Sequence, residues 1–356
     1  MINPTPPRIT FGMIVLNGEP FTRYNLRALY PFAYEIIVVE GACPAARNCA
    51  TLDGHSNDGT LSILQDFRSR EDPEQKLTII TAEDEGHPDG FWSEKDEMSQ
   101  AYARRASGNY LWQVDMDEFY HARDIKRVIK MLAEKPEIKA FTFRAVQFWG
   151  GFGYRTDGTY LRAGAQDFHR LFAWGPGYKY VTHRPPTVVD EQGRNLRNVK
   201  WLQARKLAHH AIYMYHYSFV FPFQVRAKFD YHYDLDKHNG LSSSIMEKRK
   251  AWLRNYFDLR NPFLVDDTSV VSGPSWIRSF RGEHPEGILQ LWNDIIQEKI
   301  VVEQRHTEDI EKLLASRLYR MATWFFVMIR TPFDLARSIA VILFSPLGVK
   351  KQGKKK

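Results

Sequence analysis

This chain of 356 residues lacks an apolar run long enough to cross a membrane. Spanning a bilayer takes roughly 18 or more uncharged residues, and the two apolar runs near the C-terminus, 318–329 and 336–347, are both shorter. The first seven residues contain no basic segment followed by an apolar one, so we expect no signal peptide. Cysteine is scarce. The two cysteines, Cys43 and Cys49, form neither a disulfide framework nor a metal-ligand pattern. These absences favour a reducing, cytoplasmic compartment.

Net positive charge is missing from most of the chain, although the whole chain has a net charge of +7. Residues 317–356 contain nine Lys or Arg and one acid, Asp334, so this segment carries +8 and residues 1–316 carry about −1. A protein that binds duplex DNA needs a positive surface on its main body. We therefore expect no nucleic-acid partner.

Strands and helices alternate in the first third of the chain. Apolar runs of strand length occupy 9–16, 35–40, 77–81 and 110–114, and segments with helical spacing occupy 21–30, 61–67 and 94–106. Such alternation predicts parallel pairing with right-handed crossovers. The sequence therefore predicts an open, mostly parallel α/β sheet that binds its ligands at the carboxyl ends of the strands.

The pattern changes at about residue 139. Residues 140–148 alternate as an antiparallel strand would, glycine and aromatic residues crowd the stretch that follows, and segments 245–257 and 286–316 have helical composition. We therefore divide the chain into residues 1–138, residues 139–316 and a basic tail, 317–356.

Polar side chains collect where the predicted strands end. They are Asn17 and Glu19 after the first strand, Glu40 at the end of the second, Asp58 in the next loop, and Asp115, Asp117 and Glu118 after the fourth. Each acid alone is better explained as a capping or solvated residue. Together, at one edge of a parallel sheet, they suit a base, a ribose and a hard divalent cation that bridges a diphosphate.

Four motifs in this order resemble those of a known enzyme family. They are Val15-Leu-Asn-Gly-Glu19, Ile36-Ile-Val-Val-Glu40, Ser56-Asn-Asp-Gly-Thr60 and Val114-Asp-Met-Asp-Glu118. The segment from about residue 9 to 120 resembles the nucleotide-sugar half of a GT-A glycosyltransferase of family 2, and the lipopolysaccharide-core type is the most similar. Two departures stand out: Gly18 separates Asn17 from Glu19, and a loop of about 15 residues separates Glu40 from Ser56.

The resemblance implies a GT-A fold, with helices on both faces of the sheet and an added antiparallel, loop-rich half for the acceptor. It also implies an inverting hexosyl or N-acetylhexosaminyl transfer that uses Mn²⁺ or Mg²⁺. By resemblance, the metal ligands are Asp115, Asp117 and His216. The implied donor-binding residues are Asn17, Glu19, Glu40, Asp58, Lys95, Asp115, Arg226 and Lys228. His216 lies in an aromatic segment, where a hydrogen-bonded core histidine is the alternative.

The catalytic base is the least defined part of the resemblance. Phe168-His-Arg-Leu-Phe172 precedes Tyr180-Val-Thr-His-Arg184, where the family has Val-His-Glu, so Arg184 stands at the position of the expected glutamate. The base candidates are, in order, His183, Asp167 and Asp190, and His183 must be neutral to act. Glu118 is expected to support the metal site or to contact the hydroxyls of the sugar.

The tail combines apolar and basic residues. Its first part places Leu318, Met321, Trp324, Phe325, Met328 and Ile329 on one helical face, with Arg317, Arg320 and Arg330 beside them and a lysine-rich end at 350–356. This pattern predicts a helix in the interface of an anionic membrane. The alternative is a packed terminal helix or an oligomer interface.

The sequence thus favours a metal-dependent glycosyltransferase at the inner face of the cell membrane, with a nucleoside diphosphate sugar as donor and a saccharide or lipid-linked saccharide as acceptor. The aromatic, glycine-rich stretch 148–154 is a candidate platform for that acceptor, with ordinary core as its alternative. Two other functions stay open: a membrane-associated saccharide-binding or scaffold protein with a degenerate site, and a nucleotidyltransferase, which the absence of a glycine-rich basic loop after the first strand disfavours.

Overall fold

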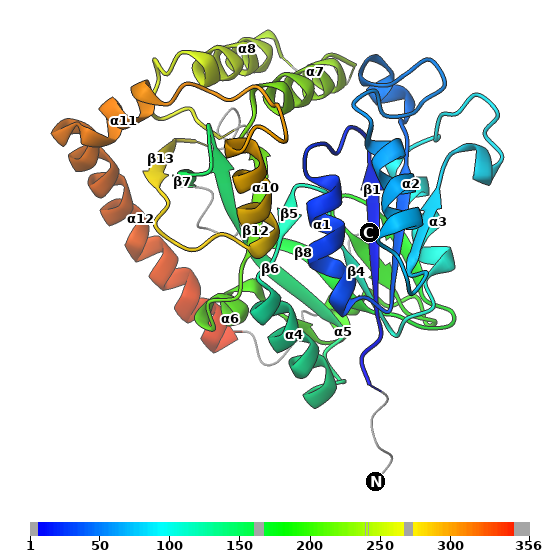
Figure 1. Ribbon diagram of the computed structural model, residues 1–356. Helices are drawn as coiled ribbons and strands as arrows, with labels where there is room; N and C mark the ends of the chain where they lie inside the picture. The colour runs from blue at the N-terminus through cyan, green and yellow to red at the C-terminus, as the bar shows by residue number, and fades with distance from the viewer. Residues whose placement is uncertain (1–5, 160–166, 239, 241, 267–272, 345–356) are drawn as a thin grey trace.

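The computed structural model describes residues 6–159, 167–238, 240, 242–266 and 273–344, with backbone alone for 234–238 and 333–344. One large sheet runs through the molecule in the order β13-β7-β6-β8-β4-β1-β2-β3 (Figure 1). Its parallel part consists of β1 (Ile9–Val15), β2 (Glu35–Glu40), β3 (Leu77–Ile80) and β4 (Tyr110–Gln113). The predicted α/β class and these four predicted strands are therefore confirmed.

The second part of the sheet is mostly antiparallel. It consists of β6 (Ala140–Trp149), β7 (Tyr154–Gly158), β8 (Asp167–Ala173) and β13 (Ser275–Ser279), while β5 (Glu118–Phe119), β11 (Trp201–Leu202) and β12 (Met214–Phe219) pair beside them. A separate hairpin is formed by β9 (Lys179–Thr182) and β10 (Thr187–Val189). Because β8 lies between β4 and β6, residues 1–138 and 139–316 share one continuous sheet.

Helices cover both faces of the parallel part. The chain steps from β1 to β3 through α1 (Thr22–Leu29) and α2 (Thr60–Arg70), then returns across the sheet to β4 through α3 (Lys95–Arg105). Right-handed crossovers in opposite directions place α3 on the face opposite α1 and α2. Gly12 of β1 allows α3 to pack closely, since a Cβ there would lie 2.4 Å from the Tyr102 ring.

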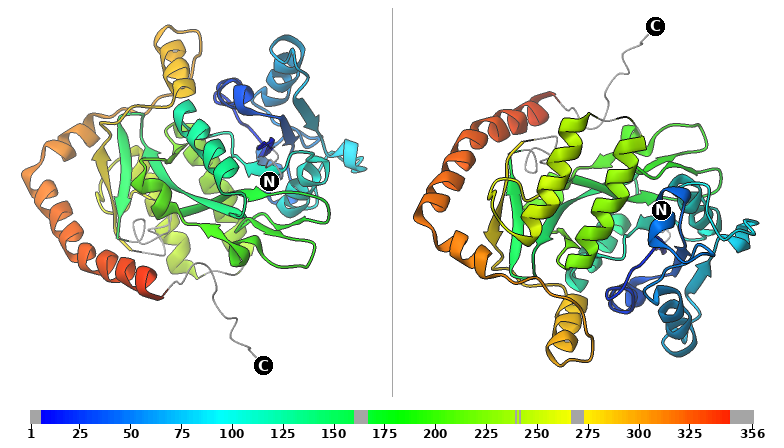
Figure 2. Two further views of the ribbon diagram at one scale, coloured as in Figure 1. Left: turned by 90° about the horizontal axis from the view of Figure 1, so that it is seen from below. Right: turned by 90° about the horizontal axis from the view of Figure 1, so that it is seen from above.

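The remaining helices cover the second part of the sheet (Figure 2). They are α4 (Ala122–Glu134), α5 (Leu196–Val199), α6 (Ala204–His209), α7 (Pro222–His238), α8 (Ser243–Phe257), α10 (Glu286–Ile296), α11 (Glu308–Ala315) and α12 (Arg317–Phe344). Segment 286–316, which has helical composition, forms two helices, α10 and α11, with a break between them. The positive φ of Glu298 (56°) ends α10, and residues 297–307 cross the surface before α11 begins.

One face of α12 is packed against the body of the protein. The Tyr319 hydroxyl contacts both backbone groups of Ile277, at 2.9 Å from its N and 3.1 Å from its O. Phe326 stacks on Trp276 with ring centroids 5.7 Å apart. Arg330, predicted to flank the membrane-facing side, points inward instead and binds Asp157 at 2.8 Å. The predicted tail is therefore docked on the edge of the sheet that is farthest from β3.

The opposite face of α12 is exposed. The side chains that the sequence placed on one stripe are 45–79% exposed, and they are Leu318, Met321, Trp324, Phe325, Met328 and Ile329. The lysine-rich end, 350–356, lies outside the described residues. Among the described residues, no helix combines the length and the apolar composition that crossing a membrane requires.

Aromatic rings join α1, β5, β12 and α10 around a buried histidine. His284 is 6% exposed, and its Nδ1 lies 2.8 Å from the Tyr217 hydroxyl, beside Phe148, Phe152 and Trp292. Burial, together with His121, lowers the pKa of His284 to about 4. The folded protein therefore holds this imidazole neutral at pH values where the unfolded chain protonates it.

We expect the neutral His284 to make the protein less stable in acid. The stabilisation is complete above the unfolded pKa of 6.5 and is lost as the pH falls, so about 3 kcal/mol should disappear by pH 4. Urea denaturation from pH 7 to 4 measures this. The His284→Gln variant should lose correspondingly less stability over the same interval, and parallel curves for the two proteins would contradict the assignment.

Candidate active site

A large cavity, about 1800 Å³, lies where β1 and β4 end. The loop after β2, the start of α3, one side of α7 and residues 300–303 complete its walls. Many of the polar residues singled out from the sequence line it: Asn17, Glu19, Asp58, Lys95, Asp115, Asp117, His183, His216 and Lys228. The structure thus brings the two predicted halves of a donor site, strand ends and second-half residues, to one place.

A buried arginine holds the turn that follows β4. The guanidinium of Arg170, 1% exposed, forms a bidentate ion pair with Glu118, which is fully buried, and donates to Asp115 Oδ2 at 2.9 Å. Asn25 of α1 adds hydrogen bonds to the carbonyl oxygens of Met116 and Glu118 at 2.9 and 2.7 Å. Glu118 was predicted to support the metal site or to contact sugar hydroxyls. It does not line the cavity, and its contacts fix the turn that carries Asp115 and Asp117.

Asp115 faces the cavity beside two arginines. Besides Arg170, the exposed Arg184 places Nη2 at 3.4 Å from Asp115 Oδ2. Burial alone would raise the pKa of Asp115, but the two guanidinium groups outweigh burial and hold the pKa well below its usual range. Asp115 is therefore an anion at neutral pH.

Asp117 projects from the same turn toward β12. The Ser218 hydroxyl donates to its Oδ2 at 2.7 Å, His216 Nε2 lies 3.4 Å from its Oδ1, and Lys228 Nζ lies 3.9 Å from its Oδ2. Burial opposes ionisation here too, but His216, Lys228 and Ser218 lower the pKa of Asp117 far below normal. The cavity thus holds a permanent carboxylate next to an imidazole.

Asp117 and His216 are the two side chains that suit a metal ion. Within the described part of the chain, no three His, Cys, Asp or Glu side chains lie close enough together to hold a cation. Mg²⁺, however, usually takes one or two protein carboxylates and completes its shell with phosphate oxygens and water. Asp117 and His216 match such a partial shell. The part of Asp115 in it stays a prediction, since both arginines engage its Oδ2.

Two buried polar atoms at this place have no hydrogen-bond partner among the described residues. Gln147 of β6 and His216 of β12 occupy paired positions on adjacent strands, so their side chains lie on one face. Gln147 Oε1 and His216 Nδ1 are both buried without a hydrogen bond, and both residues line the cavity. Unpaired buried polar groups are costly, so this position is suited to a ligand hydroxyl or a water molecule.

The end of the cavity beside β1 is shaped by the unusual loop after β2. Asn17 has a positive φ of 55°, donates to the Cys49 carbonyl at 2.6 Å and accepts from Asn57 N at 2.8 Å. Asp58 accepts from the backbone N–H of Glu19 at 2.9 Å. These contacts hold the loop against the end of β1 and place Cys43 and Cys49, neither of which forms a disulfide, on the cavity wall.

Glu40 was expected among the donor-binding residues, but the structure buries it completely. Its carboxylate accepts from Ser56 N at 2.7 Å and faces His55 Nδ1 at 2.8 Å. These contacts close the base of the loop after β2. Glu40 does not line the cavity, because the long loop folds over it.

Of the three base candidates, His183 alone lines the cavity. It is 2% exposed, and its Nδ1 lies 2.9 Å from the Ser99 hydroxyl. Burial and the neighbouring Arg184 lower its pKa to about 3. His183 is therefore neutral, as the sequence analysis required, but it is a weak base.

The other two candidates lie outside the cavity lining. Asp167 pairs with Arg144 at 3.1 Å. Asp190 turns into its own hairpin, where Arg194 binds both of its oxygens. Neither carboxylate is presented to the cavity.

Lys95 and Lys228 reach the cavity, whereas Arg226 does not. Lys95 Nζ sits 4.1 Å from the centre of the Tyr231 ring. Arg226, two residues before Lys228 on α7, does not line the cavity and pairs with Glu303, a residue of the cavity wall, at 2.7 Å. Side chains two positions apart on a helix face different directions, so only one of these two cations can serve the site.

No family model matches this chain, and no curated protein matches it. Among solved structures, it is similar to S. aureus TarS, residues 1–349, at 11% identity over 72% of this chain and 74% of that one, with a TM-score of 0.33. It is also similar to glucosyl-3-phosphoglycerate synthase from Mycobacterium tuberculosis, solved with Mn²⁺, UDP and glucosyl-3-phosphoglycerate, at 15% identity and a TM-score of 0.28. That match covers 40% of this chain and 45% of the synthase, less than half of its length. Similarities of this size do not assign a family.

We expect Arg170→Met to destabilise the protein by roughly 3–5 kcal/mol, because it leaves Glu118 as a buried charge without its partner. Combining it with Glu118→Gln should restore a large part of the loss. Arg144→Met, which removes a more exposed pair with Asp167, should cost about 1 kcal/mol or less. Chemical denaturation measures all three. Equal losses in the Arg170 and Arg144 variants would show that Arg170 does not hold the turn.

Proposed function

We propose that this protein is a metal-dependent glycosyltransferase of the GT-A type, similar to family 2, that moves a hexosyl or N-acetylhexosaminyl group from a nucleoside diphosphate sugar to a saccharide or lipid-linked saccharide. One observation carries the proposal. Asp115 and Asp117 end a parallel strand inside a cavity of about 1800 Å³, and the end of β1, His216 and Lys228 line the same cavity. An acidic turn, an imidazole and a lysine around one space suit a diphosphate with its cation.

In this proposal Asp117 and His216 hold Mn²⁺ or Mg²⁺, which would neutralise the negative charge of the departing diphosphate. Lys228, 3.9 Å from Asp117, adds a second positive charge on the same side. The residues that follow β1, Asn17 to Glu19, line the part of the cavity left for the base and the ribose. Glu19 is suited to a hydroxyl, because burial raises the pKa of its carboxyl and its Oε1 has no partner.

The acceptor is proposed to enter beside Gln147, His183 and Arg184, which line the cavity across from the β1 end. Gln147 Oε1 offers a buried acceptor for a hydroxyl. With a pKa of about 3, His183 orients the acceptor hydroxyl better than it removes the proton. Inversion at the anomeric carbon is part of the proposal through the family resemblance.

Replacing Asp117 tests the metal role directly. Asp117→Asn keeps the size of the side chain but loses its charge, so we expect Mn²⁺-dependent binding of UDP or GDP to weaken by about 100-fold or more. Titration calorimetry with and without metal measures this, and hydrolysis of a panel of nucleotide sugars should fall in parallel. Asp258→Asn, which changes an exposed aspartate outside the cavity, is the control.

Wild-type affinity in Asp117→Asn would refute the metal role. A wild-type protein that binds saccharides but no nucleoside diphosphate with metal would instead be a saccharide-binding scaffold.

We also propose that the exposed face of α12 rests on an anionic membrane, at the cytoplasmic side. The helix is already held by Tyr319, Phe326 and Arg330 on its other face. Its apolar stripe therefore stays exposed while the protein is folded, and Arg317 and Arg320 are exposed beside it. Aromatic and aliphatic side chains with flanking arginines are the composition of an interfacial helix. Such attachment would keep the enzyme next to a lipid-linked acceptor, as in the synthesis of cell envelope polysaccharide.

Removing two of the exposed aromatic rings tests the membrane proposal. Trp324→Ser with Phe325→Ser should lower binding to vesicles of phosphatidylglycerol and phosphatidylcholine by tenfold or more, since each buried ring contributes roughly 1.5–3 kcal/mol. Flotation measures the bound fraction. Leu52→Ser with Ile296→Ser removes exposed apolar side chains elsewhere and is the matched control. If both double variants float like the wild type, α12 does not bind the membrane.

A further inference from the structure

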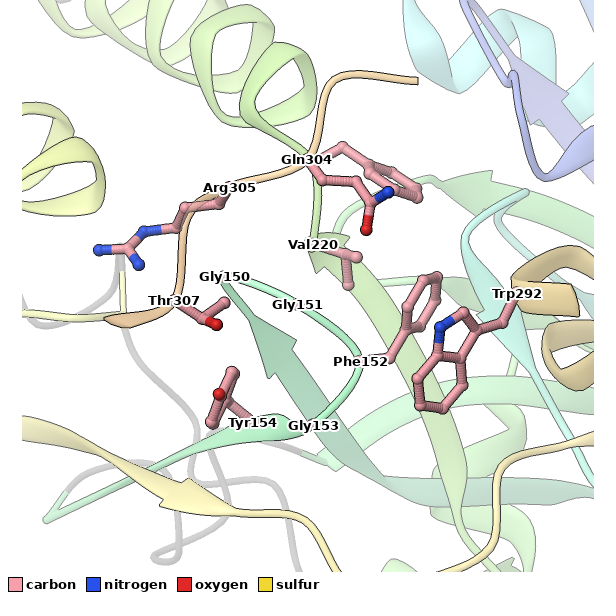
Figure 3. Close-up of a pocket in the computed structure, with 11 residues that line it drawn as sticks. Gly150, Gly151, Phe152, Gly153, Tyr154, Val220, Trp292, Gln304, Arg305 and Thr307 are labelled. Atoms are coloured by element: carbon pink, nitrogen blue, oxygen red, sulfur yellow. The ribbon is translucent and has the colours of Figure 1, made fainter. Parts of the chain in front are cut away.

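A second, smaller pocket borders the large cavity (Figure 3). Its volume is about 240 Å³, and the turn between β6 and β7 (150–154), the residues after β12 and Trp292 of α10 form its walls. Segment 297–307 separates the two spaces, because residues 300–303 line the large cavity and Gln304, Arg305 and Thr307 line the small pocket. The same alternation occurs after β12, where Phe219 faces the cavity and Val220 the pocket.

One wall of the pocket is flat and aromatic. The rings of Phe152 and Trp292 lie side by side in Figure 3, with centroids 5.4 Å apart and planes inclined by 23°. Phe152 is buried and Phe221 packs edge-on against it at 5.8 Å, which fixes its orientation. Trp292 is only half-buried. A rigid apolar surface therefore faces the pocket.

The opposite side of the pocket is polar but uncharged. Gln304 is exposed, and the hydroxyls of Thr307 and Tyr154 lie near each other in Figure 3. The Tyr154 hydroxyl donates to Glu311 Oε1, outside the pocket lining, at 3.1 Å, so it can accept a hydrogen bond from a ligand. Among the described residues that line the pocket, Arg305 alone carries a charge. Its guanidinium turns away and is bound to Asp309, with Nη1 2.7 Å from Oδ1, and to the Tyr256 carbonyl. An ionic ligand would find no counter-charge here.

Glycine keeps the pocket open. Gly150 has a φ of 69°, and a Cβ there would lie 3.0 Å from Ile310 and 3.2 Å from Arg305. Gly153 has no atom within 4 Å of its missing Cβ. The turn therefore passes under the pocket without a side chain of its own between Phe152 and Tyr154.

We propose that this pocket binds one uncharged sugar ring of the acceptor, remote from the ring that receives the new sugar. A pyranose has a C–H face that packs on an aromatic surface and hydroxyls that bond to an amide or hydroxyl, which is the pairing that Trp292, Gln304, Thr307 and Tyr154 offer. The volume is below the range of about 300–1,000 Å³ that drug-sized ligands fill, so it suits a single ring. The inference rests on the proposed function and adds that the acceptor has more than one sugar.

The indole N–H signal of Trp292 reports on binding at this pocket. It is assigned in the NMR spectrum of the ¹⁵N-labelled full chain as the signal missing from Trp292→Phe. Neutral trisaccharides (maltotriose, cellotriose and chitotriose) are then added one at a time. We expect at least one of them to shift this signal in a saturable way.

Gln304→Ala should raise the apparent dissociation constant about threefold to tenfold, the usual effect of one lost hydrogen bond. Gln304 is exposed and has no hydrogen bond among the described contacts, so this variant should fold normally. Trp292→Ala removes the NMR reporter, so its binding is measured by titration calorimetry, which should detect no saccharide binding. The exposed Trp324→Ala on α12 is the matched control and should bind as the wild type does.

The inference is overturned if no trisaccharide shifts the Trp292 signal, or if Gln304→Ala binds as tightly as the wild type. Metal-dependent UDP binding, measured on the same samples, separates this result from a failure of the proposed function. UDP binding without saccharide binding rejects the pocket alone. Saccharide binding at Trp292 without UDP binding rejects the glycosyltransferase and leaves a saccharide site.

Discussion

The ion pair between Arg170 and Glu118 is the constraint on which the candidate site depends. Three acids follow β4 within four residues, and without a buried cation their mutual repulsion and their desolvation would drive the turn apart. Arg170 comes from β8, the strand that connects the parallel and antiparallel parts of the sheet. The same side chain therefore joins the two parts of the fold and fixes Asp115. Glu118 pairs with Arg170 and does not line the cavity, whereas Asp115 and Asp117 face it.

The loop after β2 uses a buried acid, Glu40, as a structural residue. At the end of a parallel strand Glu40 is well placed for a ligand, yet the loop folds back so that His55 and Ser56 bind its carboxylate. Trp92 closes the arrangement by donating its indole N–H to the Glu40 carbonyl at 2.9 Å. The loop in turn forms part of the cavity wall. At this end, the loop residues and Asn17 face the cavity, and Glu40 does not.

The sequence was sufficient where the signal is local. Apolar runs and spacing located β1 to β4, and their parallel order placed Asn17, Asp115 and Asp117 at one edge. Contacts between distant segments carry no such signal. Arg170 lies 52 residues from Glu118, and Gln147 meets His216 only because β6 and β12 pair. Side-chain direction was equally hidden. The sequence does not distinguish Lys228 from Arg226, or Arg320 from Arg330, because each pair consists of two basic residues on one helix. The packing of α7 directs Arg226 to Glu303, and the packing of α12 directs Arg330 to Asp157.

Segment 297–307 ties the two spaces of the second half together. It is a single pass of chain between helices, with one stretch on the large cavity and the next on the small pocket. Arg305 anchors it from beneath through Asp309 and Tyr256, and Arg226 holds Glu303 on the cavity side. Because Glu303 and Arg305 are held in this way, a ligand in either space meets a wall that is already in position there, and little ordering is needed when it binds. Arg226 thus contributes to the cavity by holding the wall residue Glu303, and not by lining the cavity itself.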